Sequence, residues 1–178
     1  SLAEELIKVH RSLSGLIKLN KTLLLLSKIE NGQFLQTSEV DMNTLAADSI
    51  ALHQEIYGHK NIKADVKGEE RFILKSDEQM ASVLIGNLVK NAFLYTPEGG
   101  SIEIQMSRTG FSISNDGNAP LDKEKVFRRF YQPSGRREGA TGLGLALVYS
   151  VCINNGLDIT YDYADGRHIF SIILKKSK

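Results

Sequence analysis

Cysteine is almost absent from this 178-residue sequence, which contains only Cys152. One cysteine excludes an intrachain disulfide and a zinc site with several cysteine ligands, and it fits a reducing compartment. We expect its thiol to lie in the core, because the surrounding run is apolar. No apolar run approaches the roughly 20 residues that a membrane-spanning helix needs, and no signal-peptide pattern opens the chain. The net charge of +1 gives no electrostatic reason for binding nucleic acid or an anionic membrane.

Apolar residues make up 42% of the chain, which is enough to form a core and argues against disorder. The length allows one domain plus an appendage. The sequence begins inside a helical pattern, so we expect it to be a piece of a longer protein.

The appendage is a predicted amphipathic helix over residues 2–30. A single helix cannot bury an apolar stripe alone, so we expect partner helices from a second copy or from a segment outside this sequence. The alternative is a helix that lies across its own domain. Asn20 interrupts the apolar stripe and would help to fix the register between this helix and its partners. Asn31-Gly32 is typical of a helix C-terminus. The stripe consists of Leu2, Leu6, Val9, Leu13, Leu16 and Leu23.

The rest of the chain alternates between strand and helix patterns. Asp41 and either Ser76 or Asp77 are predicted to cap two helices, and Pro97 forbids helix at its neighbour. Residues 62–66 and 71–74 are predicted to be strands joined by a polar turn. The other predicted strands are 34–40, 101–107, 111–114, 159–163 and 168–174. The predicted helices are 42–57, the helix that begins after Ser76 or Asp77 and ends near 95, a short helix over 121–131, and 143–155.

Two asparagines stand four residues apart in the apolar segment 84–97. On a helix, this spacing puts the amides of Asn87 and Asn91 on one face. An Asn carbonyl is a neutral, hard oxygen ligand, and Mg²⁺ takes few protein ligands and draws the rest from water and nucleotide phosphates. The pair is compatible with a Mg²⁺–ATP site or, equally, with a core helix that carries internally hydrogen-bonded polar residues.

Residues 115–141, called here the glycine-rich segment, lead into the predicted helix 143–155. Loops of this length in compact domains are usually functional or disordered. Glycines allow close backbone approach and a helix N-terminus favours anions, so the segment is suited to closing over phosphates. The alternative is an ordinary solvated loop. The glycines are Gly117, Gly135 and Gly139, followed by Gly142 and Gly144, and the basic residues are Lys123, Lys125, Arg128, Arg129, Arg136 and Arg137.

Four motifs in order resemble the ATP-binding catalytic domain of bacterial sensor histidine kinases, which belongs to the GHKL group with gyrase B, MutL-type and chaperone ATPases. Each motif alone is weak, and together they cover about residues 40–178. A further stretch, LLLLSKIENGQF at 23–34, resembles the end of the second helix of the dimerisation and histidine-phosphotransfer hairpin. The motifs are NLVKNA at 87–92 for the N box, NDG at 115–117 and TGLGLAL at 141–147 for the two glycine boxes, and FRRFY at 127–131 for the F box.

The resemblance implies an α+β fold, a two-layer α/β sandwich in which three helices cover a mixed sheet, preceded by one long helix. It divides the chain into 1–32, the second hairpin helix, and 33–178, the ATP-binding catalytic domain. It implies ATP and Mg²⁺ as cofactors, with Asn91 as the metal ligand and Phe127 and Phe130 as anchors of the glycine-rich segment. The implied ATP-binding residues are Asn87, Asn91, Tyr95, Asn115, Asp116, Gly117, Phe130, Thr141, Gly142, Leu143, Gly144 and Leu145.

Three positions depart from the family's pattern. Asn115 stands where the family has an Asp that accepts from the adenine amino group, and the Asn carbonyl can still accept that bond. Ala119 replaces the second glycine of the first glycine box. Leu94 stands where Lys or Arg is often found, which removes one charge near the phosphates. The basic residues that could compensate are Arg128, Arg129, Arg136 and Arg137.

The implied activity is that of a protein histidine kinase. Group members that hydrolyse ATP carry a Glu where this chain has Asn87, and an amide cannot take a proton from water near neutral pH. We therefore expect transfer of the γ-phosphoryl to a positioned His, in which the protein mainly orients groups and neutralises charge. The family's acceptor lies in an H-E-x-x-x-P-like segment, so we expect no self-phosphorylation. The four histidines, none in that context, are His10, His53, His59 and His168.

The implied partners are the missing dimerisation helix, a second protomer and the receiver domain of a response regulator, all in the cytoplasm, without nucleic acid or membrane contact by this part. The parent protein could be a membrane-anchored sensor. Two alternatives stay open. One is a degenerate, non-catalytic nucleotide-binding or dimerisation scaffold. The other is a serine kinase that acts on an anti-sigma-antagonist-type partner, which shares the motifs but gives no reason for the helix at 2–30.

Overall fold

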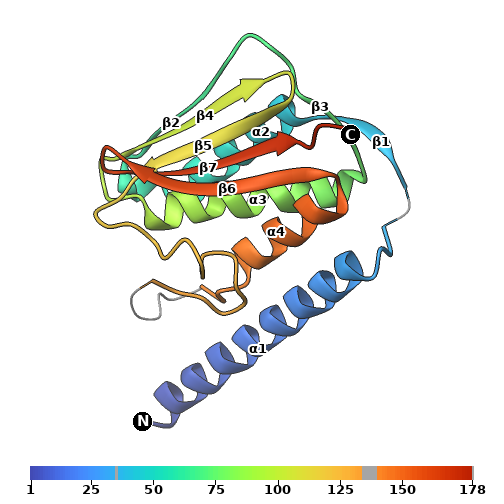
Figure 1. Cartoon of the computed structure of the whole chain (residues 1–178). Helices are drawn as coiled ribbons and strands as arrows, with labels where there is room; N and C mark the ends of the chain where they lie inside the picture. Colours follow the sequence, from blue (N-terminus) through green and yellow to red (C-terminus); the bar gives the residue numbers. More distant parts are fainter. Residues whose placement is uncertain (35, 134–139, 178) are drawn as a thin grey trace.

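The computed structural model describes residues 1–34, 36–133 and 140–177. They form two layers, a five-stranded sheet and the three helices α2, α3 and α4 on one of its faces, with the long helix α1 beside α4 (Figure 1). This is the α+β sandwich that the sequence predicts. The helices are α1 Leu2–Glu30, α2 Met42–Ile56, α3 Glu78–Tyr95 and α4 Gly144–Asn154, with a 3-10 turn at Gly58–Lys60.

The main sheet is mixed, in the order β2-β4-β5-β7-β6. β2 runs parallel to β4, and all other neighbours are antiparallel. A separate two-stranded sheet joins β1 to β3. The strands are β1 Ser38–Asp41, β2 Lys63–Lys67, β3 Ile73–Ser76, β4 Ser101–Ser107, β5 Gly110–Asp116, β6 Leu157–Ala164 and β7 Arg167–Leu174.

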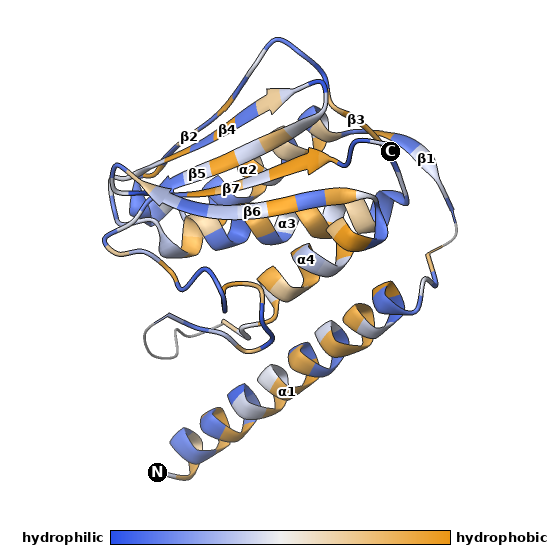
Figure 2. Cartoon of the chain, viewed as in Figure 1, coloured by the Kyte–Doolittle hydropathy of each residue, from blue (hydrophilic) through white to orange (hydrophobic). Residues whose placement is uncertain are grey.

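The core lies between the sheet and the helices, where α3 and α4 turn their apolar faces inward (Figure 2). Alternate residues of β4 and β5, such as Ile104 and Ile113, are fully buried against them. Cys152 on α4 is buried as expected, and its burial raises the pKa of the thiol to about 12. The thiol is therefore protonated and unreactive in the folded protein.

Three local predictions are corrected. The strands predicted at 62–66 and 71–74 are present as β2 and β3, shifted by one or two residues, but they do not form a hairpin, because β2 joins β4 in the main sheet and β3 joins β1 in the small one. Gly68 makes this departure possible. It has φ of 108°, and a Cβ there would lie 2.3 Å from the Met106 carbonyl oxygen. The strand predicted at 34–40 is shorter and later, at Ser38–Asp41, and residue 35 lies outside the described residues.

The third correction concerns the short helix predicted over 121–131, which is instead a series of single turns. The amide of Val126 donates to the Asp122 carbonyl, and the amide of Arg128 donates to that of Lys125. Phe130 then takes a left-handed conformation with φ of 64°. A left-handed residue cannot continue a right-handed helix, so the turns end there.

Helix α1 has the predicted span and carries its apolar stripe largely in the open. Only Leu26 and Ile29 are buried, at the end that packs on α4, whereas Leu2 and Leu16 are 73% and 61% exposed. Figure 2 shows the stripe running the length of the helix. The ion pair between Glu30 and Arg129, at 2.5 Å, also holds this end. In the part of the chain that the structure describes, no helix is both long and apolar enough to cross a membrane.

The N-cap of α3 gives a first prediction. Asp77 Oδ1 accepts from the amides of Gln79 and Met80, at 2.9 and 3.2 Å, so the alternative cap at Ser76 is excluded. Losing a helix N-cap costs roughly 0.5–2 kcal/mol. We therefore expect Asp77→Ala to lower the free energy of unfolding by about 1 kcal/mol, and Asp77→Asn, which keeps an acceptor, to lower it much less. Urea unfolding followed by circular dichroism measures both, and an unchanged midpoint for Asp77→Ala would contradict the capping role.

Candidate functional site

Helix α3 carries a buried apolar face and, beside it, the two predicted asparagines. Leu84 and Leu88 are buried in the core, and this fixes the rotation of the helix so that Asn87 and Asn91 face a cavity. Asn87 Nδ2 donates to the Val83 carbonyl at 2.8 Å, one turn back. Among the described residues, none hydrogen-bonds the side-chain amide of Asn91, so this amide is available to a ligand.

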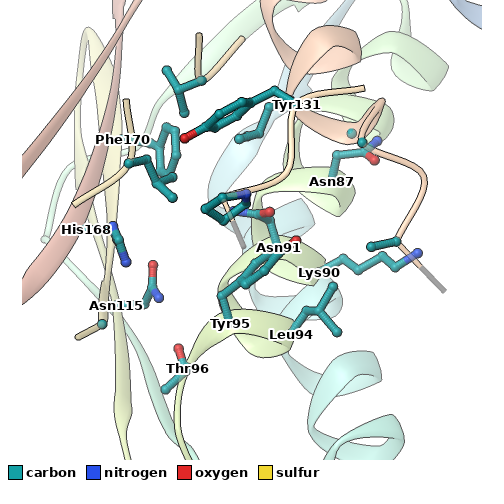
Figure 3. Close-up of a pocket in the computed structure, with 18 of the residues that line it drawn as sticks. Asn87, Lys90, Asn91, Leu94, Tyr95, Thr96, Asn115, Tyr131, His168 and Phe170 are labelled. Carbon is teal, nitrogen blue, oxygen red and sulfur yellow. The ribbon is translucent and has the colours of Figure 1, made fainter. Parts of the chain in front are cut away.

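The cavity has a volume of about 560 Å³ and opens between α3, the ends of β5 and β7, and the glycine-rich segment (Figure 3). This volume is in the range of small-molecule sites in proteins. Nine of the twelve predicted ATP-binding residues line it, and they come from separate parts of the chain. These nine are Asn87, Asn91, Tyr95, Asn115, Gly117, Thr141, Gly142, Gly144 and Leu145.

The other three predicted residues do not line the cavity. Asp116 is held by Arg167, at 2.6 Å, and by the amide of Ser101, at 2.7 Å, so its carboxylate ties β5 to β7 and β4. Phe130 is 57% exposed on the outside. Leu143 is fully buried and is the N-cap residue of α4. The sequence places these residues next to lining positions, but only the backbone path decides which side chains turn inward.

One end of the cavity is closed by polar side chains from β5 and β7. Asn115, which is 3% exposed, pairs across the sheet with His168. Asn115 Nδ2 donates to the Asp116 carbonyl at 3.1 Å, which leaves Oδ1 as the acceptor. The Tyr161 hydroxyl lies 2.9 Å from His168 Nδ1. Burial lowers the pKa of His168 below its ordinary value, so the imidazole is neutral near pH 7.

The opposite end is formed by backbone at the start of α4. Gly142 has φ of 72°, and a Cβ there would lie 2.7 Å from Phe130 Cα. The Phe130 amide donates to the Gly142 carbonyl at 2.8 Å, which holds these two residues together. A Cβ on Gly144 would lie 3.2 Å from Asn87 Oδ1. No side chain caps α4 at Leu143, so the first amides of this helix remain available at the cavity.

The charge of the cavity lining has one sign. Lys60 and Lys90 line it, and the described lining residues include no Asp or Glu. Lys60 Nζ donates to the carbonyls of Phe93 and Leu94, at 2.6 and 3.1 Å. Burial, and to a lesser extent the ammonium of Lys18 on α1, lowers the pKa of Lys90 to about 8.

Of the four arginines predicted to compensate for Leu94, the two that the structure describes, Arg128 and Arg129, do not line the cavity. Arg129 is paired with Glu30 of α1. Arg136 and Arg137, like Gly135 and Gly139, lie outside the described residues. Leu94 itself lines the cavity as predicted from its place on α3.

Several lining residues were not predicted. Lys90 lies three residues after Asn87, so its spacing on the helix could have indicated it. His168 could not have been found in this way, because only the register of β7 against β5 brings it beside Asn115. The other unpredicted lining residues include Thr96, Tyr131 and Phe170 (Figure 3).

Comparison with known proteins agrees with this geometry. Residues 76–178 match the family model described as histidine kinase-, DNA gyrase B- and HSP90-like ATPase. Sensor histidine kinase RppB of Synechocystis is 30% identical over 183 residues, covering 93% of this chain and 39% of RppB. Sensor-like histidine kinase SenX3 of Mycobacterium tuberculosis is 29% identical over 143 residues, covering 75% of this chain and 35% of SenX3.

Solved structures show the same fold. Acinetobacter baumannii histidine kinase AdeS has a TM-score of 0.73 at 20% identity, covering 99% of this chain and 85% of that one. The catalytic domain of histidine kinase ThkA has a TM-score of 0.68 at 23% identity, covering 80% of this chain and 97% of that one. The chain spans about a third of the length of the curated relatives that it matches. It belongs to the family of histidine kinase-, DNA gyrase B- and HSP90-like ATPases, and its relatives within that family are sensor histidine kinases.

Proposed function

We propose that this chain binds Mg²⁺–ATP in the cavity and supplies the γ-phosphoryl group to a histidine on a dimerisation helix outside this sequence. The observation that carries the proposal is the composition of the cavity. It combines two Asn amides, uncapped backbone amides at the start of α4 and two lysines, and its described lining has no carboxylate. Such a lining attracts a polyanion and has the neutral oxygen ligands that suit a nucleotide-bound metal ion.

The base of ATP fits the end of the cavity at Asn115. Its Oδ1 can accept from the exocyclic amine of adenine, because Nδ2 is committed to the Asp116 carbonyl. Tyr95 also lines the cavity and offers an aromatic face for the base. This arrangement supports adenine recognition despite the replacement of the family's Asp by Asn115.

The phosphates fit the opposite end. The N-terminus of α4 places amides and the positive end of its dipole beside Gly142 and Gly144. Asn91 would hold Mg²⁺, since its amide has no hydrogen-bond partner among the described residues. The described residues also contain no group of three or more His, Cys, Asp or Glu that could hold a metal ion, which fits an ion that arrives with phosphate ligands. When bound, Mg²⁺ neutralises phosphate charge.

Transfer is favoured over hydrolysis by the residue at position 87. Asn87 cannot act as a general base, and no carboxylate of the described lining stands in for one. The chain's own residues then bind and orient ATP and exclude water, and the proton of the nucleophile must be taken up by groups on the acceptor helix. We propose that residues 1–32 are the second helix of the dimerisation hairpin and that residues 33–178 are the catalytic domain.

The proposed partners follow from the same reading. The exposed stripe of α1 fits the missing hairpin helix and a second protomer. A response regulator would receive the phosphoryl group, and histidine kinase ThkA has been solved in complex with response regulator protein TrrA. We place this part of the protein in the cytoplasm, where such a relay operates.

The proposal predicts phosphorylation in trans. With [γ-³²P]ATP and Mg²⁺, the chain alone should remain unlabelled and release little inorganic phosphate. After addition of a hairpin segment from the parent protein that carries the acceptor His, that segment should acquire a label that is stable to base and labile to acid. The matched control is the same segment with His replaced by Gln.

Two outcomes would count against this function. ATP binding without any transfer would favour a non-catalytic scaffold, and a label stable to acid would favour a serine kinase. Rapid phosphate release by the chain alone would contradict the role assigned to Asn87.

A further inference from the structure

We propose that His168 of β7 donates a hydrogen bond to N1 of the adenine ring, and that the Tyr161 hydroxyl of β6 keeps the imidazole proton on the nitrogen that makes this bond. The inference rests on the proposed function, because it concerns how the same cavity recognises the base of ATP. It deepens that function, because it adds a specificity-determining residue and a positioning residue that lie outside the four sequence motifs.

His168 lies beside Asn115 at one end of the cavity. The two residues are directly opposite each other in the antiparallel pairing of β5 with β7, so their side chains are on the same face of the sheet. Both are almost fully buried, and both line the cavity. Figure 3 shows them next to each other, across the cavity from Tyr95 of α3. A base held between the sheet and α3 therefore meets Asn115 and His168 together.

A hydrogen-bond network fixes the tautomer of His168. Burial lowers the pKa of this residue below its ordinary value, so the ring is neutral near pH 7 and carries one proton. The Tyr161 hydroxyl accepts from the amide of Leu121 at 2.9 Å and lies 2.9 Å from His168 Nδ1. The described residues offer this hydroxyl no other acceptor, so its proton goes to Nδ1. Since Nδ1 then accepts, the imidazole proton is on Nε2.

Nε2 of His168 is open to a ligand. None of the described residues hydrogen-bonds it, whereas every fully buried side-chain nitrogen or oxygen in the described part of the chain has a partner. Nε2 is therefore accessible and not enclosed in the core. Gly117 permits this access, because a Cβ there would lie 2.1 Å from Nε2. The donor of His168 thus lies beside the backbone against which the base is proposed to rest.

The two side chains match one edge of adenine. Asn115 Oδ1 is an acceptor, since Nδ2 donates to the Asp116 carbonyl, and His168 Nε2 is a donor. The exocyclic amine of adenine is a donor and the adjacent N1 is an acceptor, and both are far from N9, where the ribose and phosphates are attached. Guanine and hypoxanthine have an oxygen and a protonated nitrogen at these places, which would leave the buried polar groups unpaired. The pair therefore selects ATP over GTP and ITP.

Calorimetric titration of ATP and 1-deaza-ATP, in which a C–H group replaces N1, tests the bond to His168. The wild type should bind 1-deaza-ATP roughly two- to fivefold more weakly than ATP, the loss of one hydrogen bond between uncharged groups. His168→Met should bind both nucleotides alike, whereas His168→Gln, which has a similar length and keeps a donor, should retain most of the preference. His59→Met is the matched control, since His59 is exposed and does not line the cavity.

The tautomer is measured separately from binding, and a purely structural role of Tyr161 would not change it. The ¹⁵N NMR signals of the imidazole should place the proton of His168 on Nε2 in the nucleotide-free wild type. In Tyr161→Phe, Nδ1 loses its donor, so we expect a mixture of tautomers and a smaller preference for ATP over 1-deaza-ATP. Tyr149→Phe is the matched control, because Tyr149 does not line the cavity, and it should behave as the wild type.

Three outcomes would overturn the inference while leaving the proposed function intact. They are equal binding of ATP and 1-deaza-ATP by the wild type, a proton on Nδ1 of His168, and a preference for ATP that persists undiminished in His168→Met. Failure of the wild type to bind ATP at all would instead overturn the proposed function, on which the inference rests.

Discussion

Replacing Gly117 with alanine is expected to weaken ATP binding by roughly 5- to 150-fold, the equivalent of about 1–3 kcal/mol of overpacking. A Cβ at this position would lie 2.1 Å from His168 Nε2 and 2.3 Å from its Cδ2. The backbone of Gly117 cannot retreat easily, because its amide donates to the Gly166 carbonyl and its carbonyl accepts from the Tyr163 hydroxyl. The His168 ring must therefore move, and it already lines the cavity where the base would lie.

A rescue separates this mechanism from general damage to the fold. Gly117→Ala combined with His168→Ala removes the colliding ring and should recover most of the lost affinity. Gly86→Ala is the matched control, because a Cβ at Gly86 meets no atom within 4 Å. Calorimetric titration of ATP measures all three variants, and wild-type affinity in Gly117→Ala would show that the base does not lie against this glycine.

Much of the fold could be predicted because the relevant signals are local. Asp41 and Asp77 cap α2 and α3 as expected, since an Asp before a helical pattern satisfies free amides within three residues. The hairpins β4–β5 and β6–β7 follow from alternating patterns around Gly110 and Gly166. The asparagine pair faces a cavity because the spacing of four residues fixes its direction on α3.

The misses have a common cause, because they depend on contacts between distant parts of the chain. β2 and β4 pair in parallel although β3 and α3 lie between them in the sequence, so no turn motif predicts this pairing. Asp116, a predicted ATP-binding residue, does not line the cavity, because Arg167, 51 residues later, binds its carboxylate. The turns at 121–131 have helical composition, yet the left-handed Phe130 and the pinned Gly142 impose a different backbone.

The structure also reinterprets the missing charge at Leu94. Sequence comparison within the motif directs attention to the arginines of the glycine-rich segment, of which Arg129 is paired with Glu30. The helix geometry instead indicates Lys90, because side chains three and four residues apart share one face of α3. Lys90 lines the cavity four residues before Leu94 and is the described lysine of α3 that could supply this charge.

The second large effect is expected at Asn91. Its amide faces the cavity and is hydrogen-bonded by none of the described residues, so alanine should remove the proposed metal ligand without exposing a buried polar group. We expect Asn91→Ala to bind ATP roughly 10- to 100-fold more weakly in the presence of Mg²⁺, and to lose most of the difference that Mg²⁺ makes. Asn154→Ala is the matched control. The side-chain amide of Asn154 donates to a backbone carbonyl one turn back in its own helix at 2.8 Å, as that of Asn87 does, but Asn154 does not line the cavity.

The central claim is that the cavity holds ATP together with a magnesium ion at Asn91. Calorimetric titration of ATP, with Mg²⁺ and with EDTA, into the wild type, Asn91→Ala and Asn154→Ala tests it most directly. The predicted result is Mg²⁺-dependent binding by the wild type and by Asn154→Ala, and weak, metal-independent binding by Asn91→Ala. No binding by the wild type in excess Mg²⁺, or an undiminished effect of Mg²⁺ in Asn91→Ala, would contradict it.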